Sequence, residues 1–152
     1  PEKGEKGIAC VDPEFDVFRG NMDGILFVTD QHRVVLELKT AKSAEYKKFV
    51  DLGVRIWKPI YYSQIQSYMG MTGLKHAVIF VINKDTSEWH CEWVEFDEIF
   101  YYEMKAKAVM LSNMKEEPKK INENPCYWIC QSCKYKDLCH KPGASLSERP
   151  NT

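Results

Sequence analysis

The chain has 152 residues, a length that fits one domain, and its 44% apolar and 12% aromatic content supports a packed core and excludes a wholly disordered chain. The formal net charge is -1, so a surface that binds nucleic acid would have to be a local basic patch. No apolar run is long enough to span a bilayer, and the polar start PEKGEKGIAC is no signal peptide. We therefore expect a cytoplasmic protein without membrane contacts.

The first part of the chain has the composition of β-strands. Residues 15–29, FDVFRGNMDGILFVT, are rich in β-branched and aromatic residues and predict two strands or one bent strand. A polar turn separates them from a strand over residues 34–40, and together these segments predict a meander of adjacent antiparallel strands. Helical signals then run from Ser43, a candidate N-cap, to about Leu52, where Gly53 ends the segment.

The second part alternates between helical and strand patterns. We predict a helix over residues 59–70, strands over 77–83 and 88–96, and a long helix over 98–114 that is capped by Asp97. The order β-β-β-α-α-β-β-α places the chain in the α/β class, with a mixed central β-sheet flanked by helices. The predicted divisions are a core over 1–115, a charged linker over 116–125, a cysteine module over 126–140 and a polar tail over 141–152.

Three charged residues interrupt the apolar strands. Glu37 and Lys39 lie two residues apart on a predicted strand and therefore point to one face, and Asp23 occupies a similar position in the preceding segment. If the two strands pair, the two carboxylates converge, and a hard cation such as Mg²⁺ or Mn²⁺ would relieve their repulsion. Lys39 would then orient water or stabilise charge on a phosphate. The simpler alternative is a salt bridge between Glu37 and Lys39 on a solvated strand face.

Two further features are candidates for nucleic-acid contacts. Gln64 and Tyr68 share one face of the predicted helix, either at the edge of the core or as ordinary helix surface. The window from Lys39 to Lys58 holds six basic and two acidic residues, Lys42 among the basic ones, and a phosphate backbone near Asp23 would meet it. The alternative is a solvated helix face.

Four of the six cysteines crowd into one short segment. Cys126, Cys130, Cys133 and Cys139 follow the pattern C-x3-C-x2-C-x5-C, which predicts a zinc or iron–sulfur site in a reducing compartment. His140 adjoins the last of them and is an alternative ligand, and Cys10 is another if it folds back toward the module. Cys91 is predicted to be a buried structural cysteine.

These motifs, in this order, resemble the RecB-like branch of the PD-(D/E)XK nuclease superfamily. The matching pieces are GNMDGIL, LELKT, QIQSY and CQSCKYKDLC, and VINKDTSEWH and CKYKDLCH look most like phage-encoded members. The resemblance implies a restriction-endonuclease-like core and Mg²⁺- or Mn²⁺-dependent cleavage of DNA, in many members as exonucleases acting on single strands or DNA ends. A phage-encoded member would act in the host cytoplasm.

The resemblance also assigns roles to residues. It implies that Asp23 and Glu37 are metal ligands, that Lys39 is the catalytic lysine, and that Gln64 and Tyr68 contact DNA. In iron–sulfur members, Cys130, Cys133 and Cys139 match ligands of a [4Fe–4S] cluster. Such members usually draw a fourth cysteine, and often a further metal ligand, from an N-terminal helix, and we expect that helix to be missing or rearranged here. The competing function is a catalytically inactive DNA-binding module of the same fold.

Overall fold

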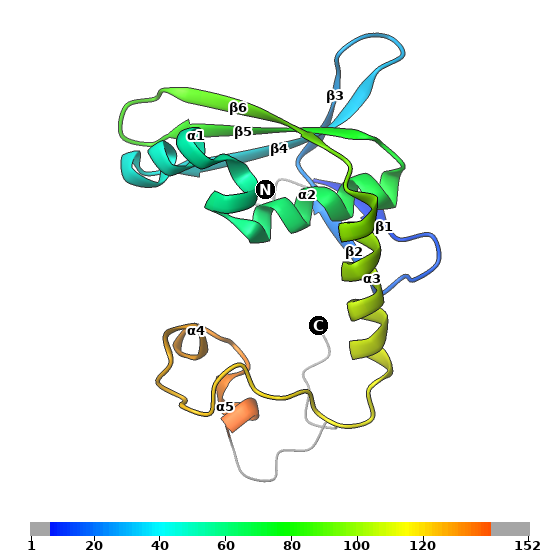
Figure 1. Cartoon of the computed structure of the whole chain (residues 1–152), viewed down its shortest axis with the longest axis vertical. Coiled ribbons are helices and arrows are strands. Elements are labelled where there is room, and N and C mark those ends of the chain that lie inside the picture. Colours follow the sequence, from blue (N-terminus) through cyan, green and yellow to red (C-terminus); the bar gives the residue numbers. More distant parts are fainter. Residues whose placement is uncertain (1–6, 141–152) are drawn as a thin grey trace, which may run out of the picture. The chain divides into compact units, whose positions relative to one another are not determined.

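The computed structural model of the chain describes residues 7–140 (Figure 1). These residues divide into two compact units, with the boundary between Val109 and Met110. The strands are β1 (Ile8–Val11), β2 (Arg19–Met22), β3 (Gly24–Phe27), β4 (Arg33–Ala41), β5 (His76–Asn83) and β6 (Trp89–Glu95). The helices are α1 (Ser43–Trp57), α2 (Pro59–Thr72), α3 (Glu98–Asn113), α4 (Trp128–Gln131) and α5 (Lys136–His140). Among the described residues, no helix is both long and apolar enough to cross a membrane.

A four-stranded mixed sheet forms the centre of the first unit. Its strand order is β3-β4-β5-β6, and β4 runs parallel to β5 whereas the two outer pairs are antiparallel. A parallel pair needs a long crossover connection, and α1 and α2 supply it between β4 and β5. The predicted mixed sheet with flanking helices is therefore confirmed.

The two helices cover one face of this sheet (Figure 1). Alternate residues of the two central strands point into the core beneath them, and six of these are at most 7% exposed: Val35, Glu37, Ala41, Ala77, Ile79 and Val81. No described helix of the first unit covers the opposite face (Figure 1), and Leu38 and Ile82 on it are 51% and 39% exposed. Glu37 is thus the charged member of an otherwise apolar buried row.

Helix α1 is interrupted at Gly53, whose φ of 72° and ψ of 166° are not helical. The predicted end of a helical segment near Leu52 is therefore confirmed, but the sequence did not predict that a second segment follows directly and runs to Trp57. The restart is stabilised from β6, where a Glu92 carboxylate oxygen accepts a hydrogen bond of 2.7 Å from the Val54 amide. A glycine at the break is required by its positive φ.

The predicted meander is wrong in its first strand. β2 pairs with β1 in a separate two-stranded antiparallel sheet, and only β3 pairs with β4. The chain changes sheets at Asp23, the residue between β2 and β3. The pairing of β1 with β2 was not predicted, because strands of four residues are too short to indicate their partners.

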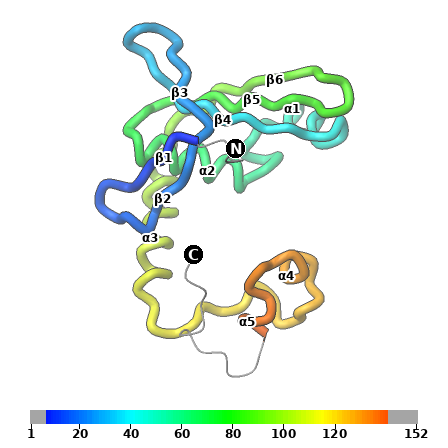
Figure 2. Tube along the Cα trace, turned by 180° about the vertical axis from the view of Figure 1, so that it is seen from behind, coloured from blue at the N-terminus to red at the C-terminus, as the bar shows by residue number. Residues whose placement is uncertain are grey.

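The β1–β2 hairpin is fastened to α3 by a buried network. Asp12 is 2% exposed and accepts hydrogen bonds from the Tyr101 hydroxyl and from the Glu14 amide at 3.0 Å. Lys105 lies 2.8 Å from Asp12 and 2.7 Å from Glu14. Figure 2, seen from behind, shows this hairpin beside the helix, as Figure 1 does from the front. The predicted cap of the helix is confirmed, since Asp97 accepts a hydrogen bond of 3.0 Å from the amide of Phe100.

Candidate functional site

Strand β4 presents Glu37 and Lys39 to the covered face of the sheet. The two side chains lie on the same side because strand residues alternate. Glu37 is fully buried at 0% exposure, and the side chain of Lys39 is 18% exposed. This burial argues against an ordinary salt bridge on a solvated strand face, because a carboxylate is costly to bury without a specific partner.

Asp23 reaches the same place from the neighbouring strand. Gly24 is paired with Leu36, so continuing the antiparallel register by one residue sets Asp23 opposite Glu37. Because β3 begins only at Gly24, the Leu38 amide has no strand partner on that side, and an Asp23 carboxylate oxygen accepts its hydrogen bond at 2.7 Å. The sequence-based expectation of convergence is thus met by a residue at a strand junction.

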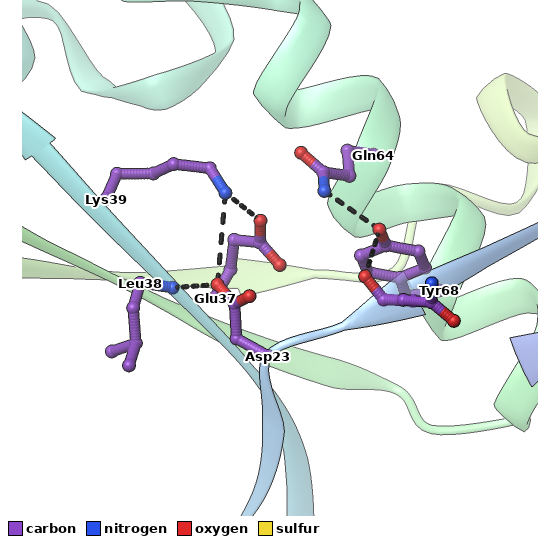
Figure 3. A network of polar contacts seen from close by, with 7 residues as sticks. Asp23, Glu37, Leu38, Lys39, Gln64 and Tyr68 are labelled. Carbon is purple, nitrogen blue, oxygen red and sulfur yellow. Dashed lines mark hydrogen bonds and ion pairs between the residues drawn. The ribbon is translucent and has the colours of Figure 1, made fainter. Parts of the chain in front are cut away.

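The Lys39 ammonium group lies between the two carboxylates (Figure 3). It donates a hydrogen bond to Oε1 of Glu37 and lies 3.9 Å from Oδ2 of Asp23. It also lies 5.1 Å from the centre of the Tyr61 ring, within cation–π distance. The lysine is therefore held from three directions, with its charge directed at the acidic pair.

The second carboxyl oxygen of Glu37 differs from the first in its contacts. Its Oε2 atom is buried and makes no hydrogen bond within the described part of the chain. Burial raises the pKa of Glu37; the hydrogen bond and charge of Lys39 act in the opposite direction, and the charge of Asp23 adds to the rise. Buried polar atoms are usually satisfied. An unsatisfied carboxylate oxygen beside a second carboxylate is a donor set that fits a hard divalent cation.

Gln64 and Tyr68 lie together on α2, and their side chains are linked. Gln64 donates a hydrogen bond of 2.8 Å to the Tyr68 hydroxyl, which in turn donates one of 2.7 Å to the backbone carbonyl of Asn21 (Figure 3). Tyr68 is only 6% exposed, and Gln64 is half-buried. The pair therefore connects α2 to the end of β2, two residues before Asp23.

The basic window after β4 is largely neutralised by local ion pairs. Its paired members are Lys47 with Asp51, Lys48 and Lys58 with Glu45, and Arg55 with Asp97. Lys42 is exposed and forms no ion pair within residues 7–140. It is the residue before α1, in place of the predicted cap Ser43, whose hydroxyl donates to Asp85 instead. Lys42 is thus a cation in this window that remains available to a phosphate.

The cysteines of the second unit lie on and around two short helices. Cys130 is buried, Cys139 is half-buried, and Cys126 and Cys133 are exposed. Over residues 7–140, no group of three or more His, Cys, Asp or Glu side chains is arranged to hold a metal ion. The four thiols are therefore not gathered around one point in the described part of the chain, and the geometry gives no support to the predicted cluster or zinc site. The prediction for Cys91 is wrong, since that residue is exposed on β6.

The structure adds residues to the site that the sequence reasoning missed. The Asn21 carbonyl and the Leu38 amide act through the backbone, which no side-chain pattern reveals, and the ring of Tyr61 lies beside the Lys39 ammonium group. Gly20 is visible in the sequence as a glycine three residues before Asp23, and a glycine in a strand can indicate that another group approaches the backbone closely. A Cβ atom at this position would lie 2.8 Å from the Tyr68 ring.

With this geometry established, two comparisons with known proteins find similarity. Residues 2–75 match the family model described as "YqaJ-like viral recombinase domain", a stretch that contains Asp23, Glu37, Lys39, Gln64 and Tyr68. None of the curated proteins compared matches the chain.

Among solved structures, the fold is similar to an alkaline exonuclease from Laribacter hongkongensis. The TM-score is 0.58 at 20% identity, over 68% of this chain and 52% of that one, and the same values hold for the structure of that enzyme in complex with dAMP. A structure titled SSO0001 has a TM-score of 0.49 at 19% identity, over 80% of this chain and 50% of that one. The chain thus spans about half the length of these proteins.

Proposed function

We propose that this chain is a metal-dependent deoxyribonuclease that hydrolyses phosphodiester bonds as an exonuclease or a DNA-end-processing enzyme. The observation that carries the proposal is the convergence of Asp23 and Glu37 beside Lys39, with one buried Glu37 oxygen that has no hydrogen-bond partner among the described residues. DNA as the substrate is supported by the matching recombinase family model and by the similarity to an alkaline exonuclease. The proposal includes membership in the RecB-like PD-(D/E)XK superfamily.

Asp23 and Glu37 are the residues that would hold Mg²⁺ or Mn²⁺. Such an ion, when bound, polarises a phosphoryl oxygen and lowers the pKa of a water molecule. The protein contributes a rigid cradle, because Glu37 is fixed within the core and Asp23 is fixed by the Leu38 amide. These constraints hold the two carboxylates together before any cation arrives.

Lys39 has two consecutive roles in this proposal. Without a divalent ion it offsets the charge of Glu37 and, more weakly, that of Asp23. With substrate present, its ammonium group is close enough to the acidic pair to orient the attacking water or to stabilise negative charge developing on the phosphate. Because a lysine ammonium has three hydrogens, it can keep its contact with Glu37 while it does so.

For DNA placement we propose Gln64 and Lys42. Gln64 is half-buried on α2 beside the site, and Lys42 is exposed three residues beyond Lys39, just past the end of β4. Lys42 would contact the phosphate backbone, a contact that adds affinity and salt dependence without reading sequence. Tyr68 was grouped with these two residues from the sequence, but its burial gives it little surface for a DNA contact.

The cysteine module is proposed as a separate metal centre on sequence spacing alone. By resemblance its ligands would be Cys130, Cys133 and Cys139 around a [4Fe–4S] cluster, with Cys126 or His140 as the fourth, and zinc is the alternative. The imidazole Nε2 of His140 is buried and makes no hydrogen bond within residues 7–140. That unpartnered nitrogen supports His140 as a ligand candidate.

The first prediction tests the proposed activity. Asp23→Asn and Glu37→Gln should each lower the cleavage rate of labelled single- and double-stranded DNA by at least about 100-fold at saturating Mg²⁺ or Mn²⁺, because each variant loses a charged ligand. Lys39→Ala should lower the rate while metal affinity is kept. Asp51→Asn, which alters an exposed ion pair on α1, is the matched control.

Two results would contradict the proposal. Near-normal cleavage by either carboxylate variant would remove the assigned site. A wild-type protein that binds DNA but never cleaves it, with either metal, would favour the alternative of a catalytically inactive DNA-binding module.

A further inference from the structure

We infer that Tyr68 is a positioning residue for Asp23 rather than a DNA contact: it holds the end of β2 in place and thereby sets where the Asp23 carboxylate lies. This inference rests on the proposed function for the meaning of Asp23, but its geometry stands on contacts within the first unit.

The ring of Tyr68 packs directly on the backbone of β2. A Cβ atom added to Gly20 would lie 2.8 Å from the ring, closer than real Cβ contacts come, so the strand approaches the ring because glycine is there. The ring is 6% exposed, which leaves almost no surface on which a base would stack. The packing thus accounts for both the tyrosine and the glycine.

The hydroxyl of Tyr68 adds a directed bond one residue further along. A phenol has a single proton, and the Gln64 amide donates into the phenolic oxygen at 2.8 Å. The proton of Tyr68 is therefore directed to the Asn21 carbonyl at 2.7 Å. Gln64 orients the hydroxyl, and the hydroxyl fixes the backbone of Asn21.

Asn21 is followed by Met22 and then by Asp23, where the chain leaves one sheet for the other. At this junction the position of Asp23 is fixed by the hydrogen bond that its carboxylate accepts from the Leu38 amide and by the end of β2, which directly precedes it. Met22 is 2% exposed, so the short connection is packed into the core. A shift of β2 at Asn21 is consequently passed on to the Asp23 carboxylate and to its bond with Leu38.

The test compares Tyr68→Phe with Tyr62→Phe. Tyr68→Phe keeps the ring and removes only the hydroxyl. Tyr62→Phe is a matched control on the same helix, because the Tyr62 hydroxyl donates a hydrogen bond of 3.4 Å to Asp97, the residue before α3, rather than to β2. In metal-free protein, the Leu38 amide should exchange its hydrogen about tenfold faster in Tyr68→Phe, the scale of one lost hydrogen bond. The core amides of Val35 and Ile79 should keep their protection. Tyr62→Phe should leave all three unchanged.

Metal and DNA binding supply the second readout. Mn²⁺ affinity measured by calorimetry should fall by about tenfold or more in Tyr68→Phe, as for loss of an outer-shell partner, while affinity for single-stranded DNA without divalent metal stays at the wild-type value. Unchanged exchange of Leu38 would overturn the inference, and so would normal Mn²⁺ affinity with weakened DNA binding. If wild-type protein binds no Mn²⁺, the proposed function fails on its own, and the Leu38 exchange rate still decides the positioning role.

Discussion

Glu37 lies where the surrounding protein disfavours the charged form of its carboxyl group. The residue is fully buried in an apolar row, and burial raises the pKa of its carboxyl group despite the adjacent Lys39. Ionisable groups with shifted pKa values of this kind are typical of functional sites, where stability is often lower than the fold would otherwise allow. A divalent cation would remove the conflict by supplying positive charge to the free oxygen.

The second prediction follows from this pKa. A raised carboxyl pKa means that the folded state favours the protonated form of Glu37. The protonated carboxyl group therefore adds to the free energy of unfolding at pH values below the ordinary glutamate pKa, and this contribution is lost as the pH rises through the raised pKa. Glu37→Gln imitates the protonated form. In EDTA it should be more stable than wild type by about 1 kcal/mol near pH 8, the scale of single stabilising substitutions, with the difference closing below roughly pH 4.

Denaturant unfolding at several pH values measures this difference. Glu103→Gln, an exposed glutamate on α3, is the control and should not change stability at any pH. A metal-free Glu37→Gln protein that unfolds more easily than wild type at pH 8 would show that the bond to Lys39 outweighs burial.

At this scale the sequence predicts side-chain direction but not backbone contacts. Alternation along a strand was enough to place Glu37 and Lys39 on one face. The location of Asp23 opposite Glu37 needed the strand register, which depends on tertiary pairing. The hydrogen bond from the Tyr68 hydroxyl to the Asn21 carbonyl could not be predicted, because it depends on how closely α2 approaches β2, a strand far away in the sequence.

Among the elements, the attachment of the β1–β2 hairpin to α3 depends on a buried ion pair. Burial acts to raise the pKa of Asp12, but the hydrogen bonds from Lys105, Tyr101 and the Glu14 amide together lower it. The charged Asp12 therefore adds to the free energy of unfolding at pH values above the ordinary aspartate pKa, and this contribution is lost as the pH falls through the lowered pKa. The same bonds to Asp12 and Glu14 raise the pKa of Lys105.

The third prediction concerns this attachment. Lys105→Met should cost about 3 kcal/mol of unfolding free energy, because it leaves Asp12 buried without its counter-charge. Lys107→Met, exposed on the same helix, should cost less than about 0.5 kcal/mol. Chemical denaturation measures both, and the double variant Asp12→Asn/Lys105→Met should recover part of the loss. Equal stability of the two single variants would contradict the assigned role of the network.

The elements themselves were predicted unevenly. The strands and helices from residue 34 to 114 were predicted because each carries a long periodic pattern. Gly53 was predicted correctly as the end of a helical segment, but the restart directly after it was not predicted, because it is stabilised by Glu92 from β6, which is far away in the sequence. The separate two-stranded sheet could not be foreseen, because strands of four residues leave their partners undetermined.

For the molecule as a whole, the cysteine module determines how the second unit is stabilised in our proposal. The linker predicted before it is charged and has little to bury, so a metal would contribute much of the folding free energy of this unit. The fourth prediction is that anaerobically purified protein holds iron and is brown, with broad absorption around 400 nm, as expected for a thiolate-bound cluster. Colourless protein with bound zinc would support the alternative.

Two variants separate the module from the other cysteines. Cys133→Ser should release the metal, whereas Cys91→Ser, on an exposed position of β6, should retain it. Metal analysis of each protein is the measurement. Protein that holds neither iron nor zinc, or unchanged metal content in Cys133→Ser, would mean that the cysteine spacing has been misinterpreted.

The sheet face that no helix of the first unit covers determines how the tryptophan fluorescence of the protein will behave. Of the four tryptophans, Trp57 is 9% exposed, whereas Trp89 and Trp93 on β6 are 62% and 45% exposed, and Trp128 of the second unit is 71% exposed. Emission from the native protein therefore comes mainly from indoles in contact with water, and it will change little when the core unfolds. Circular dichroism is the better probe of unfolding. Fluorescence is suited to another purpose, because any macromolecule that covered β6 would shield two indoles from a quencher such as acrylamide.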